Sequence, residues 1–374
     1  MTIVKRTALL LIASLIASFA IGAYAADNQV NRPKIIGVAH IAIYVSDLQK
    51  ARAFYKDFLG YEEPYAIKRD DGTDRIAVIK INEDQYIELF ADPPKQDGQL
   101  NHVSILTDSA EQMRLYLDSK GINVPEKVGK GRIGNSNFNI VDPDGHTLEI
   151  VQYEPASWTR RETGKHIPPT RISTHMPHLG FTVRDLNVSL KFYGDVLDFR
   201  EVWRGSPSPQ VLSWVHMQVP DGKEFFELML YSRPLTSEQL GGKNHLCLIV
   251  PDIQNAVADL NARPARKGYT RPIEIRTGVN GKRQANLFDP DGTRVELMEA
   301  DTVDGKVVAP SKAPAPRFDP GATPVATSAT RPSTVANIHR HSTGSIAMMF
   351  LDRLAEFRMY WNNGSETNVP RSSL

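Results

Sequence analysis

Histidine and glutamate recur at matched places along this 374-residue chain, and they are the side chains with the clearest capacity for metal chemistry. Four of the ten His each stand at the head of an apolar, strand-like segment, and a Glu follows each of them 47 to 51 positions later. Imidazole and carboxylate groups together suit the divalent ions of Fe, Mn, Co, Ni and Zn. The eight candidate metal ligands are His40, Glu88, His102, Glu149, His178, Glu227, His245 and Glu296.

The recurrence decides between a ligand role and an ordinary structural one. A single His at the start of a strand is usually a satisfied core or surface residue, but four at one repeat position indicate a shared role. A Glu within an apolar strand is costly if its charge is buried without a partner. Two His and two Glu around an octahedral ion leave two positions for substrate oxygens, which indicates a reaction centre. The alternative is that all eight residues remain while one of the two centres has lost its metal.

Each interval from His to Glu has the same expected secondary structure. The residues after the His alternate as in a strand, and an acidic residue then caps a helix, as Leu48 and Tyr55 on one helical face and the stop at Gly60 indicate. Short β-rich runs follow, and Asp-Pro-Asp-Gly turns at residues 142–145 and 289–292 introduce the last strand of two copies. Each copy is therefore expected to fold as a βαβββ module. The expected capping residues are Asp47, Asp108, Asp185 and Asp252.

The four copies group into two domains of the α+β class. Short joins favour pairing the first module with the second and the third with the fourth, with an ordered crossover at residues 155–175 between the pairs. The expected domains are residues 35–154 and 176–300. The modules span residues 35–92, 100–154, 176–232 and 243–300.

Charge balance and the N-terminal segment limit the class of protein. Lys and Arg total 44 against 43 Asp and Glu, so no single-sign field favours a nucleic acid partner. Residues 1–25 predict a signal peptide, because Lys5 and Arg6 precede an apolar run and Ala23-Tyr24-Ala25 offers a cleavage site. The run is short for a membrane span, although an uncleaved anchor is the alternative. We expect a periplasmic or secreted monomer or homodimer with no stable membrane insertion after cleavage.

The remaining segments carry weaker signals. Residues 303–374 are expected to be a largely disordered linker and tail, and their first part, residues 303–332, is rich in Pro, Ala, Ser and Thr and is expected to be extended or disordered. Residues 346–361 form an amphipathic stretch that either docks on a domain or, as we favour, is a loosely ordered end. Cys247 is the single Cys, which excludes an intrachain disulfide and predicts a small apolar core residue.

The pattern of His and Glu, together with Arg52-Ala53-Phe54-Tyr55 and Leu59-Gly60-Tyr61, resembles the vicinal oxygen chelate superfamily. That superfamily includes glyoxalases, extradiol ring-cleaving dioxygenases, epimerases, and fosfomycin- and bleomycin-resistance proteins. The resemblance spans about residues 35–300. It implies four βαβββ modules forming two glyoxalase-like domains, each closing around one divalent transition metal. It also implies a small-molecule substrate whose vicinal oxygens bind that metal.

Within the superfamily, the two complete sets of His, Glu, His and Glu are similar to bacterial glyoxalase I. This similarity implies a metal-dependent isomerase or lyase in which a metal-bound Glu moves the proton of the substrate. By analogy, Glu149 and Glu296 are the candidate catalytic bases. The chemistry is sound in itself, because a Lewis-acid ion stabilises an enediolate and a nearby carboxylate serves as general base.

Two alternatives stay open. The subset His178, His245 and Glu296 is similar to the Fe(II) site of extradiol ring-cleaving dioxygenases, but Asn286 stands where that family has a Tyr, and Asn139 replaces it in the second module. A non-catalytic protein that binds small molecules, as among the resistance proteins, is the third class. Substrate choice is expected to depend on cavity residues such as Tyr44, Phe138, Trp203 and Trp214.

Overall fold

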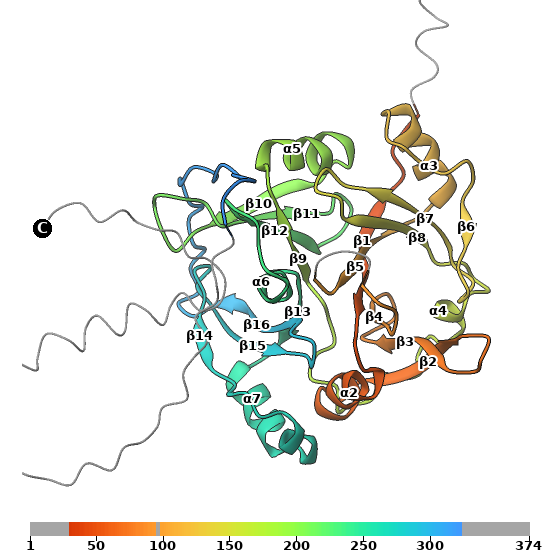
Figure 1. Ribbon diagram of the computed structural model, residues 1–374, viewed down its shortest axis with the longest axis vertical. Coiled ribbons are helices and arrows are strands. Elements are labelled where there is room, and N and C mark those ends of the chain that lie inside the picture. Colours follow the sequence, from red (N-terminus) through yellow and green to blue (C-terminus); the bar gives the residue numbers. More distant parts are fainter. Residues whose placement is uncertain (1–29, 95–97, 324–374) are drawn as a thin grey trace, which may run out of the picture.

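The computed structural model describes residues 30–94 and 98–323, which form two curved eight-stranded sheets (Figure 1). The first sheet has the strand order β2-β3-β4-β1-β5-β8-β7-β6, and the second has the matching order β10-β11-β12-β9-β13-β16-β15-β14. The strands of the first sheet are β1 (Ile35–Tyr44), β2 (Glu62–Lys68), β3 (Asp74–Lys80), β4 (Tyr86–Phe90), β5 (Leu100–Thr107), β6 (Gly129–Lys130), β7 (Ser136–Val141) and β8 (Thr147–Gln152). Those of the second are β9 (His178–Val183), β10 (Arg200–Gly205), β11 (Trp214–Gln218), β12 (Phe225–Leu230), β13 (His245–Val250), β14 (Ile275–Thr277), β15 (Lys282–Phe288) and β16 (Arg294–Thr302).

Each half of a sheet is one module, in which the first strand pairs in parallel with the last. Thus β1 pairs with β4 and β5 pairs with β8, while β1 and β5 join the two modules as antiparallel neighbours. The second sheet repeats this with β9, β12, β13 and β16. The predicted α+β class, with four βαβββ modules in two domains, is confirmed, and the first module pairs with the second. The predicted signal peptide and the stretch at residues 346–361 lie outside the described residues.

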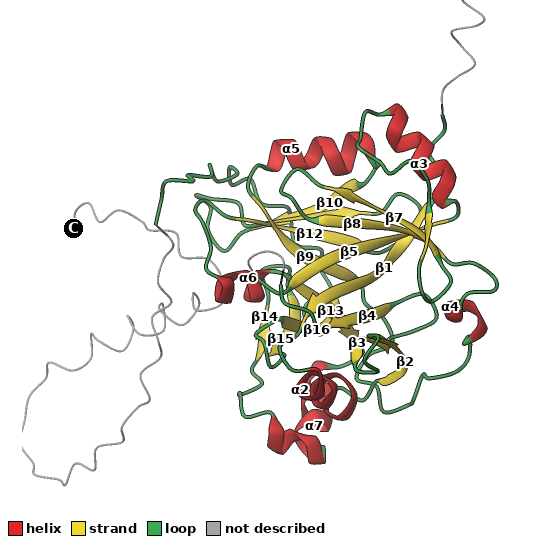
Figure 2. Ribbon diagram, turned by 45° about the vertical axis from the view of Figure 1, so that its right-hand side comes forward, coloured by secondary structure: helices red, strands yellow, loops and turns green. Residues whose placement is uncertain are grey.

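The helices cover the sheet faces that the alternating apolar residues occupy (Figure 2). In β1, Ile41 and Ile43 are buried in one core cluster with Phe54 and Phe58 from the first helix, whereas His40 points to the opposite face. The helices are α2 (Leu48–Arg52) continued by the π-helical η1 (Ala53–Phe58), α3 (Ala110–Ser119), α4 (Trp158–Arg161), α5 (Leu186–Leu190) continued by the π-helical η2 (Lys191–Val196), α6 (Ser237–Lys243), α7 (Ile253–Ala262) and the 3-10 segment η3 (Pro264–Gly268).

Helix capping follows the sequence pattern in three of the four modules. The side chains of Asp47, Asp185 and Asp252 accept hydrogen bonds from backbone N–H groups of the first helical turn. In the second module the prediction is wrong, because Asp108 does not cap the helix and the hydroxyl of Ser109 caps α3 instead. Asp108 accepts a hydrogen bond from the backbone N–H of Lys34, so its carboxylate joins the second module to the start of β1.

The two domains pack so that the first module faces the fourth and the second faces the third. Both views place α2 beside α7 and α3 beside α5 (Figures 1 and 2). The Phe58 ring stacks on Tyr269 with centroids 4.9 Å apart, and the Tyr116 hydroxyl donates to the carbonyl of Val196. One buried core cluster therefore runs through both domains.

A Tyr from each π-helical segment reaches the Asp-Pro-Asp-Gly turn of the other domain. The Tyr193 hydroxyl donates to Asp142 at 2.8 Å, and the Tyr55 hydroxyl donates to Asp289 at 3.3 Å. The two contacts differ in one neighbour: Asp142 also pairs with the Nδ1 atom of His146, whereas Asp289 has no such imidazole within hydrogen-bond distance among the described residues. Burial therefore raises the pKa of Asp289 to about 7. Burial acts on Asp142 too, but hydrogen bonding and attraction by His146 lower its pKa below the ordinary value.

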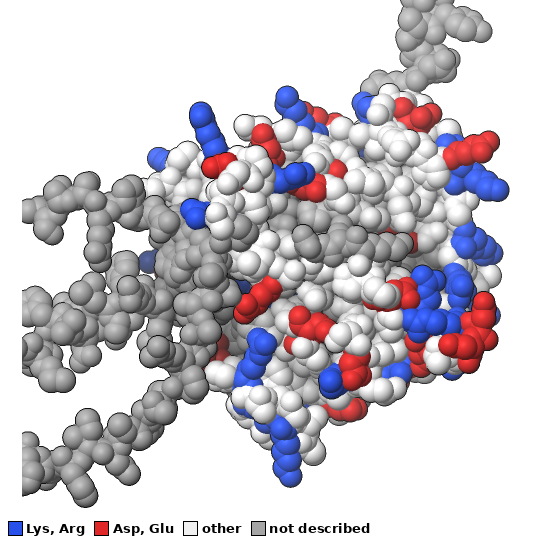
Figure 3. Space-filling model, viewed as in Figure 1, with Lys and Arg blue, Asp and Glu red and all other residues white. Residues whose placement is uncertain are grey.

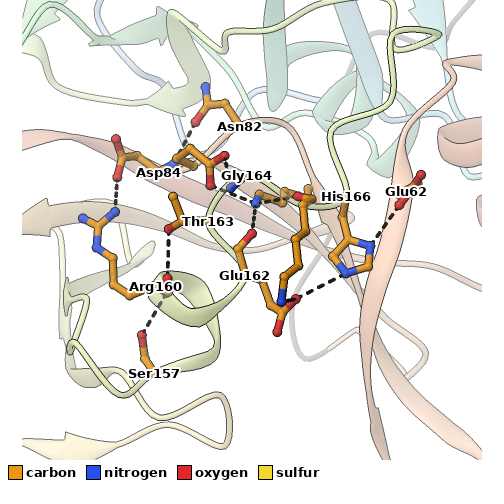
Figure 4. A network of polar contacts seen from close by, with 12 residues as sticks. Glu62, Asn82, Asp84, Ser157, Arg160, Glu162, Thr163, Gly164 and His166 are labelled. Carbon is orange, nitrogen blue, oxygen red and sulfur yellow. Dashed lines mark hydrogen bonds and ion pairs between the residues drawn. The ribbon is translucent and has the colours of Figure 1, made fainter.

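The crossover between the domains is fixed to the first module by polar contacts (Figure 4). Lys80 donates to the carbonyls of Glu162 and Lys165, and Arg160 forms an ion pair with Asp84. Trp158 packs against Tyr65 of β2 with ring centroids 5.8 Å apart. The crossover therefore covers the side of the first sheet that the helices leave free.

Residues 303–323 take the extended form, one of the two forms expected for this segment. This segment makes backbone hydrogen bonds to the second domain, from Leu212 to Pro314 and from Ser311 to Arg204. The Trp203 indole also donates to the carbonyl of Val308. The composition rich in Pro and Ala excludes a helix but not an extended strap, which is the form the chain takes here. The rest of the expected tail lies outside the described residues.

The surface carries both signs of charge without a broad patch of either on the face shown in Figure 3. This mixed distribution agrees with the near balance of 44 basic and 43 acidic residues. Within residues 30–94 and 98–323, no helix has the length and apolar character needed to cross a membrane.

The asymmetry of the two aspartates predicts opposite effects of one substitution. Because the pKa of Asp289 is higher in the folded chain than in the unfolded chain, its stabilising contribution is complete below about pH 4 and is lost as the pH rises through 7. Asp289→Asn should therefore raise the free energy of unfolding by about 1–3 kcal/mol at pH 8.5. Urea unfolding at pH 5 and pH 8.5 measures the change.

Asp142→Asn is the matched control. The lowered pKa of Asp142 means that its carboxylate stabilises the folded chain at neutral pH and loses that effect in acid, so the same substitution should destabilise at pH 8.5. Equal losses of stability in both variants at pH 8.5 would contradict this account.

Candidate metal centres

Each sheet gathers one complete set of two His and two Glu on the face opposite its helices. In the first sheet the four residues come from the four central strands, with His40 on β1, Glu88 on β4, His102 on β5 and Glu149 on β8. The second sheet places its set on β9, β12, β13 and β16. Two strands differ from the sequence expectation that the His stands first, because β1 begins at Ile35, before His40, and β5 begins at Leu100, before His102. Because each sheet is curved, the side chains on this face of its four central strands point toward one another.

The first set is tightly clustered. The Nε2 atom of His40 lies 2.9 Å from Nε2 of His102 and 2.7 Å from Oε2 of Glu149. That carboxylate oxygen is 3.5 Å from Nε2 of His102. Oε2 of Glu88 completes the group at 3.8 Å from Nε2 of His102. The structure therefore brings all four predicted ligands of the first domain to one point.

The second set repeats the arrangement. The Nε2 atom of His178 lies 3.2 Å from Nε2 of His245 and 3.2 Å from Oε2 of Glu296. Oε2 of Glu227 is 3.3 Å from Nε2 of His245. All eight residues singled out in the sequence are thus placed in two equivalent centres, one in each domain.

The spacing fits a divalent transition ion. In each centre, two imidazoles and the Glu of the last strand offer ligand atoms that all lie within 4.8 Å of one another. Ligands at about 2.1 Å from an octahedral ion are about 3 Å apart when adjacent and about 4.2 Å apart when opposite. The observed separations within these groups fall in that range, so His40, His102 and Glu149 would hold one ion, and His178, His245 and Glu296 another. Glu88 and Glu227 each lie beside the second imidazole of their centre, at 3.8 and 3.3 Å, and are the fourth candidate ligands.

Hydrogen bonds orient one imidazole of each centre. The Nδ1 atom of His102 faces the side-chain oxygen of Asn101 at 2.9 Å, and Nδ1 of His245 faces the carbonyl of Lys243 at 2.7 Å. Both partners accept, so each Nδ1 carries the proton and each Nε2 turns its lone pair toward the centre. This is the tautomer that a metal ligand requires.

The four carboxylates have unequal electrostatic environments. Burial raises the pKa of Glu88, and the attraction of His40 and His102 only partly offsets it. For Glu149, burial is outweighed by the attraction and hydrogen bonds of the same two imidazoles, which lower its pKa. Burial is likewise outweighed at Glu227, where hydrogen bonds from His216 and His245 hold the pKa well below its usual range. The pKa of Glu296 is also lowered, because burial is outweighed by its hydrogen bond with His178 together with the attraction of Arg294 and the two imidazoles. Glu88 is therefore the carboxylate most readily protonated among the four.

Further residues border the second centre. His216 on β11 donates to Glu227 at 3.0 Å, and Arg294, which the sequence did not single out, lies beside His245. Cys247 is fully buried, as expected, and it lies on β13 with its Cα directly opposite that of Glu296. The alternation of side chains along a strand could have indicated this position, because Cys247 follows His245 by two positions and therefore lies on the same face of β13.

The aromatic residues proposed to line the cavities divide into two groups. Trp203 lies against the His216 ring with centroids 4.7 Å apart, and Trp214 shares the face of His216 on β11. Phe138 is instead buried in the apolar core under the helices, so its expected cavity role is wrong. Its neighbours in β7 alternate away from it, and Asn137 donates to Glu149.

Gly180 is required by the close approach of an imidazole. It lies opposite His245 in the pairing of β9 with β13, and a Cβ atom there would stand 1.9 Å from Cε1 of that ring. In the first domain Ala42 is the residue opposite His102. The second centre is therefore packed more tightly around its imidazole than the first.

Comparisons with known proteins agree with this architecture. The family model described as Glyoxalase/Bleomycin resistance protein/Dioxygenase superfamily matches residues 37–150 and 175–297. The lactoylglutathione lyase of Schizosaccharomyces pombe is 23% identical over 308 residues, which cover 70% of this chain and 95% of that protein. The Mn(II)-bound glyoxalase from Novosphingobium aromaticivorans superposes with a TM-score of 0.53 and 15% identity, over 77% of this chain and 89% of that chain. The 2,3-dioxygenase LapB from Pseudomonas sp. KL28 gives 0.54 and 16%, over 77% and 99%. At these identities the structural likeness establishes the fold.

Gly180→Ala tests the packing around the second centre. The added methyl group displaces the His245 imidazole, so we expect the second centre to bind Mn(II) at least tenfold more weakly, in line with the effect of losing an orienting contact. Mn(II) titration monitored by electron paramagnetic resonance, in a His40→Ala background that disables the first centre, measures the affinity. Ala42→Gly, in a His178→Ala background, is the control and should leave Mn(II) binding at the first centre within threefold. An unchanged affinity in Gly180→Ala would show that the ring has room to move.

Proposed function

Since the chain belongs to the Glyoxalase/Bleomycin resistance protein/Dioxygenase superfamily, we propose that it is a metal-dependent isomerase or lyase acting on small substrates that carry vicinal oxygens. The observation that carries this proposal is the compact group of two imidazoles and one carboxylate in each domain, with a second Glu beside one of the imidazoles. Four protein ligands leave two positions of an octahedral ion open, which is the number that a vicinal oxygen pair fills. The Mn(II)-bound state of a structural neighbour supports Mn(II) among the candidate metals.

The chemistry divides between the ion and the carboxylates. When bound, a divalent ion supplies a Lewis acid to the two substrate oxygens. The carboxylates must then take a proton from the carbon next to the oxygen pair and return it, which requires a group that is close to the substrate and not fully engaged by other partners.

The contacts in the first centre favour Glu88 for this step. Glu149, the base implied by the family resemblance, accepts from Asn137 and is held within 3.5 Å of both imidazoles. Glu88 has a single imidazole contact at 3.8 Å, and its pKa is raised by burial. Glu149 is therefore better suited to hold the ion, and Glu88 is better suited to carry the proton.

The second centre has the opposite assignment. Glu227 is held by His216 at 3.0 Å and by His245 at 3.3 Å, so its two oxygens are engaged. Glu296 contacts His178 at 3.2 Å and has a longer separation of 3.8 Å from His245. Glu296 stays the candidate base of this centre, as the resemblance to glyoxalase I implied.

Ring cleavage by an extradiol dioxygenase is the second candidate, and one observation favours it. His178, His245 and Glu296 form a compact group of two imidazoles and one carboxylate. The fourth ligand Glu227 adds a second carboxylate to that group, and Asn286 occupies the position opposite Glu296 where the dioxygenase family has a Tyr. Both features favour isomerase or lyase chemistry.

Two assays on the purified chain distinguish the reactions. Under Mn(II), Ni(II) or Co(II), we expect turnover of a panel of thiol adducts of 2-oxoaldehydes, without consumption of oxygen. In a His178→Ala background that isolates the first centre, Glu88→Gln should lower kcat by about a hundredfold or more, the usual contribution of a general base, while Glu88→Asp retains part of the rate. Oxygen uptake with a panel of catechols under Fe(II), in the absence of isomerase turnover, would contradict the proposal.

We also propose that the protein is exported, on the strength of the N-terminal residues described above. Cleavage after Ala25 makes Ala26 the first residue of the mature chain. N-terminal sequencing of protein recovered outside the cytoplasm reads this residue directly, and an intact Met1 there would contradict cleavage.

A further inference from the structure

A third imidazole stands beside the second centre, at a place where the first centre has an aliphatic side chain. In the pairing of β11 with β12, His216 lies opposite Glu227, whereas Val78 lies opposite Glu88 in the first domain. The Nε2 atom of His216 donates to Oε1 of Glu227 at 3.0 Å, which leaves Oε2 facing His245 at 3.3 Å. His216 therefore fixes how this candidate metal ligand is turned, and Val78 cannot do the same for Glu88.

Two aromatic rings hold the His216 ring in place. The residue is buried, and its ring stacks on Phe225 with centroids 4.4 Å apart. Phe225 also stacks on the candidate metal ligand His178 at 4.7 Å. Trp203, which pairs with His216 between β10 and β11, contacts the same imidazole at 4.7 Å. Because a contact that orients a metal ligand contributes about 10–100-fold to metal affinity, the position of this ring matters for the second centre.

The indole of Trp203 is in turn held by the strap, the extended segment formed by residues 303–323. Its Nε1 atom donates to the carbonyl of Val308 at 3.2 Å. The indole also lies against Gly205, where a Cβ atom would stand 1.9 Å from Cη2 of the ring. A continuous series of contacts therefore leads from the strap through the indole and the imidazole to the carboxylate of Glu227.

The strap runs from one edge of the second sheet to the other, whose outermost strands are β14 and β10 (Figure 1). The backbone N–H of Val303 donates at 2.8 Å to the carbonyl of Gly281, in the turn between β14 and β15. Further along the strap, the backbone N–H of Ser311 donates at 2.9 Å to the carbonyl of Arg204 on β10. The strap thus joins the two edges of the curved sheet, on the face where the metal ligands lie.

The first domain has a similar covering segment but lacks an imidazole at the matching place. Trp158 of the crossover packs against Tyr65 on β2 with ring centroids 5.8 Å apart, and its backbone N–H donates to the carbonyl of Ile133 at 2.7 Å. Ile133 lies between β6 and β7, so this segment also joins the two edges of its sheet. With Val78 opposite Glu88, no hydrogen-bonding side chain at that register position carries the contact on to the metal ligand. The first domain therefore serves as an internal control.

We propose that Trp203 and His216 are positioning residues for the metal ligand Glu227, and that docking of the strap and binding of a divalent ion at the second centre strengthen each other. The ion holds Glu227 in one orientation, which fixes the imidazole, the indole and the strap in turn. Coupling between two sites is reciprocal, so a docked strap raises the affinity for the ion by the same factor. This coupling rests on the proposed function, because it concerns the same metal site. The first centre binds its ion independently of the strap.

Hydrogen–deuterium exchange of the strap tests the coupling in the full-length chain. His40→Ala and His102→Ala together remove the first centre, and mass spectrometry follows exchange in peptides from residues 303–314 with and without saturating Mn(II). The backbone N–H groups that hold the strap should exchange about fivefold or more slowly when Mn(II) is bound. In the control chain, His178→Ala and His245→Ala confine Mn(II) to the first centre, and exchange in the same peptides should change by less than about twofold.

Substitutions at His216 assign the effect to this imidazole, with Mn(II) affinity measured by electron paramagnetic resonance in the same background. His216→Val gives the second centre the residue type found in the first, and should weaken Mn(II) binding about tenfold or more and remove the protection of the strap. His216→Gln keeps an N–H donor and should retain the affinity within about threefold. In a Glu227→Gln background, His216→Val should change the affinity by less than about twofold, because the imidazole acts through that carboxylate.

Trp203→Phe separates the strap from the metal ligand. The substitution keeps an aromatic ring beside His216 but removes the indole N–H that donates to Val308. Mn(II) should therefore still bind at the second centre, while its effect on exchange in the strap falls below about twofold. Thermal unfolding confirms that each variant is folded.

The outcomes separate this inference from the proposed function. Exchange in the strap that stays unchanged when the second centre binds Mn(II) overturns the coupling and leaves the proposed function standing. Full protection of the strap by Mn(II) in His216→Val overturns the role of this imidazole in the same way. Failure of the second centre to bind Mn(II) contradicts both the coupling and the proposed function. Because the comparison with and without Mn(II) needs no substitution at His216 or Trp203, it decides the question even if those variants fail to fold.

Discussion

The convergence of two imidazoles and two carboxylates on the buried side of each sheet is the constraint on which the structure depends. Bringing Nε2 of His40 within 2.9 Å of Nε2 of His102 and 2.7 Å of a carboxylate oxygen sets acceptor groups against one another. Such a cluster is stable only when protons or a cation lie between its members. The order of the strands produces this cluster, because its residues come from the four central strands of a curved sheet.

The same constraint explains why the modules occur in pairs. One module supplies one His and one Glu, so two must join through β1 and β5, or through β9 and β13, to complete a centre. The open side of each completed sheet is then covered by chain that follows its last strand, the crossover in the first domain and residues 303–323 in the second. Each domain thus closes its own centre, and the helices on the opposite faces join the domains into one core.

The sequence predicts the repeat and the candidate ligands, but it does not predict contacts between residues that are distant in the chain. Fourfold recurrence identified all eight ligand candidates, and periodicity identified the modules, because both are local properties of the chain. The positions of Arg294 and Cys247 depend on which strand lies beside β13, which no local pattern records. Phe138 was misplaced because a single aromatic residue does not reveal which face of its strand is buried. The contacts that hold residues 303–323 on the second domain were not predicted, because backbone groups of this segment make them and no side-chain pattern records them.

The central claim is that each domain holds one divalent ion, and metal content per chain tests it most directly. Protein purified without chelators, loaded with Mn(II) and desalted is analysed by inductively coupled plasma mass spectrometry. The account predicts two ions per chain, one in either His40→Ala or His178→Ala, and none in the double variant. A chain that binds no ion, or a double variant that retains two, would contradict it.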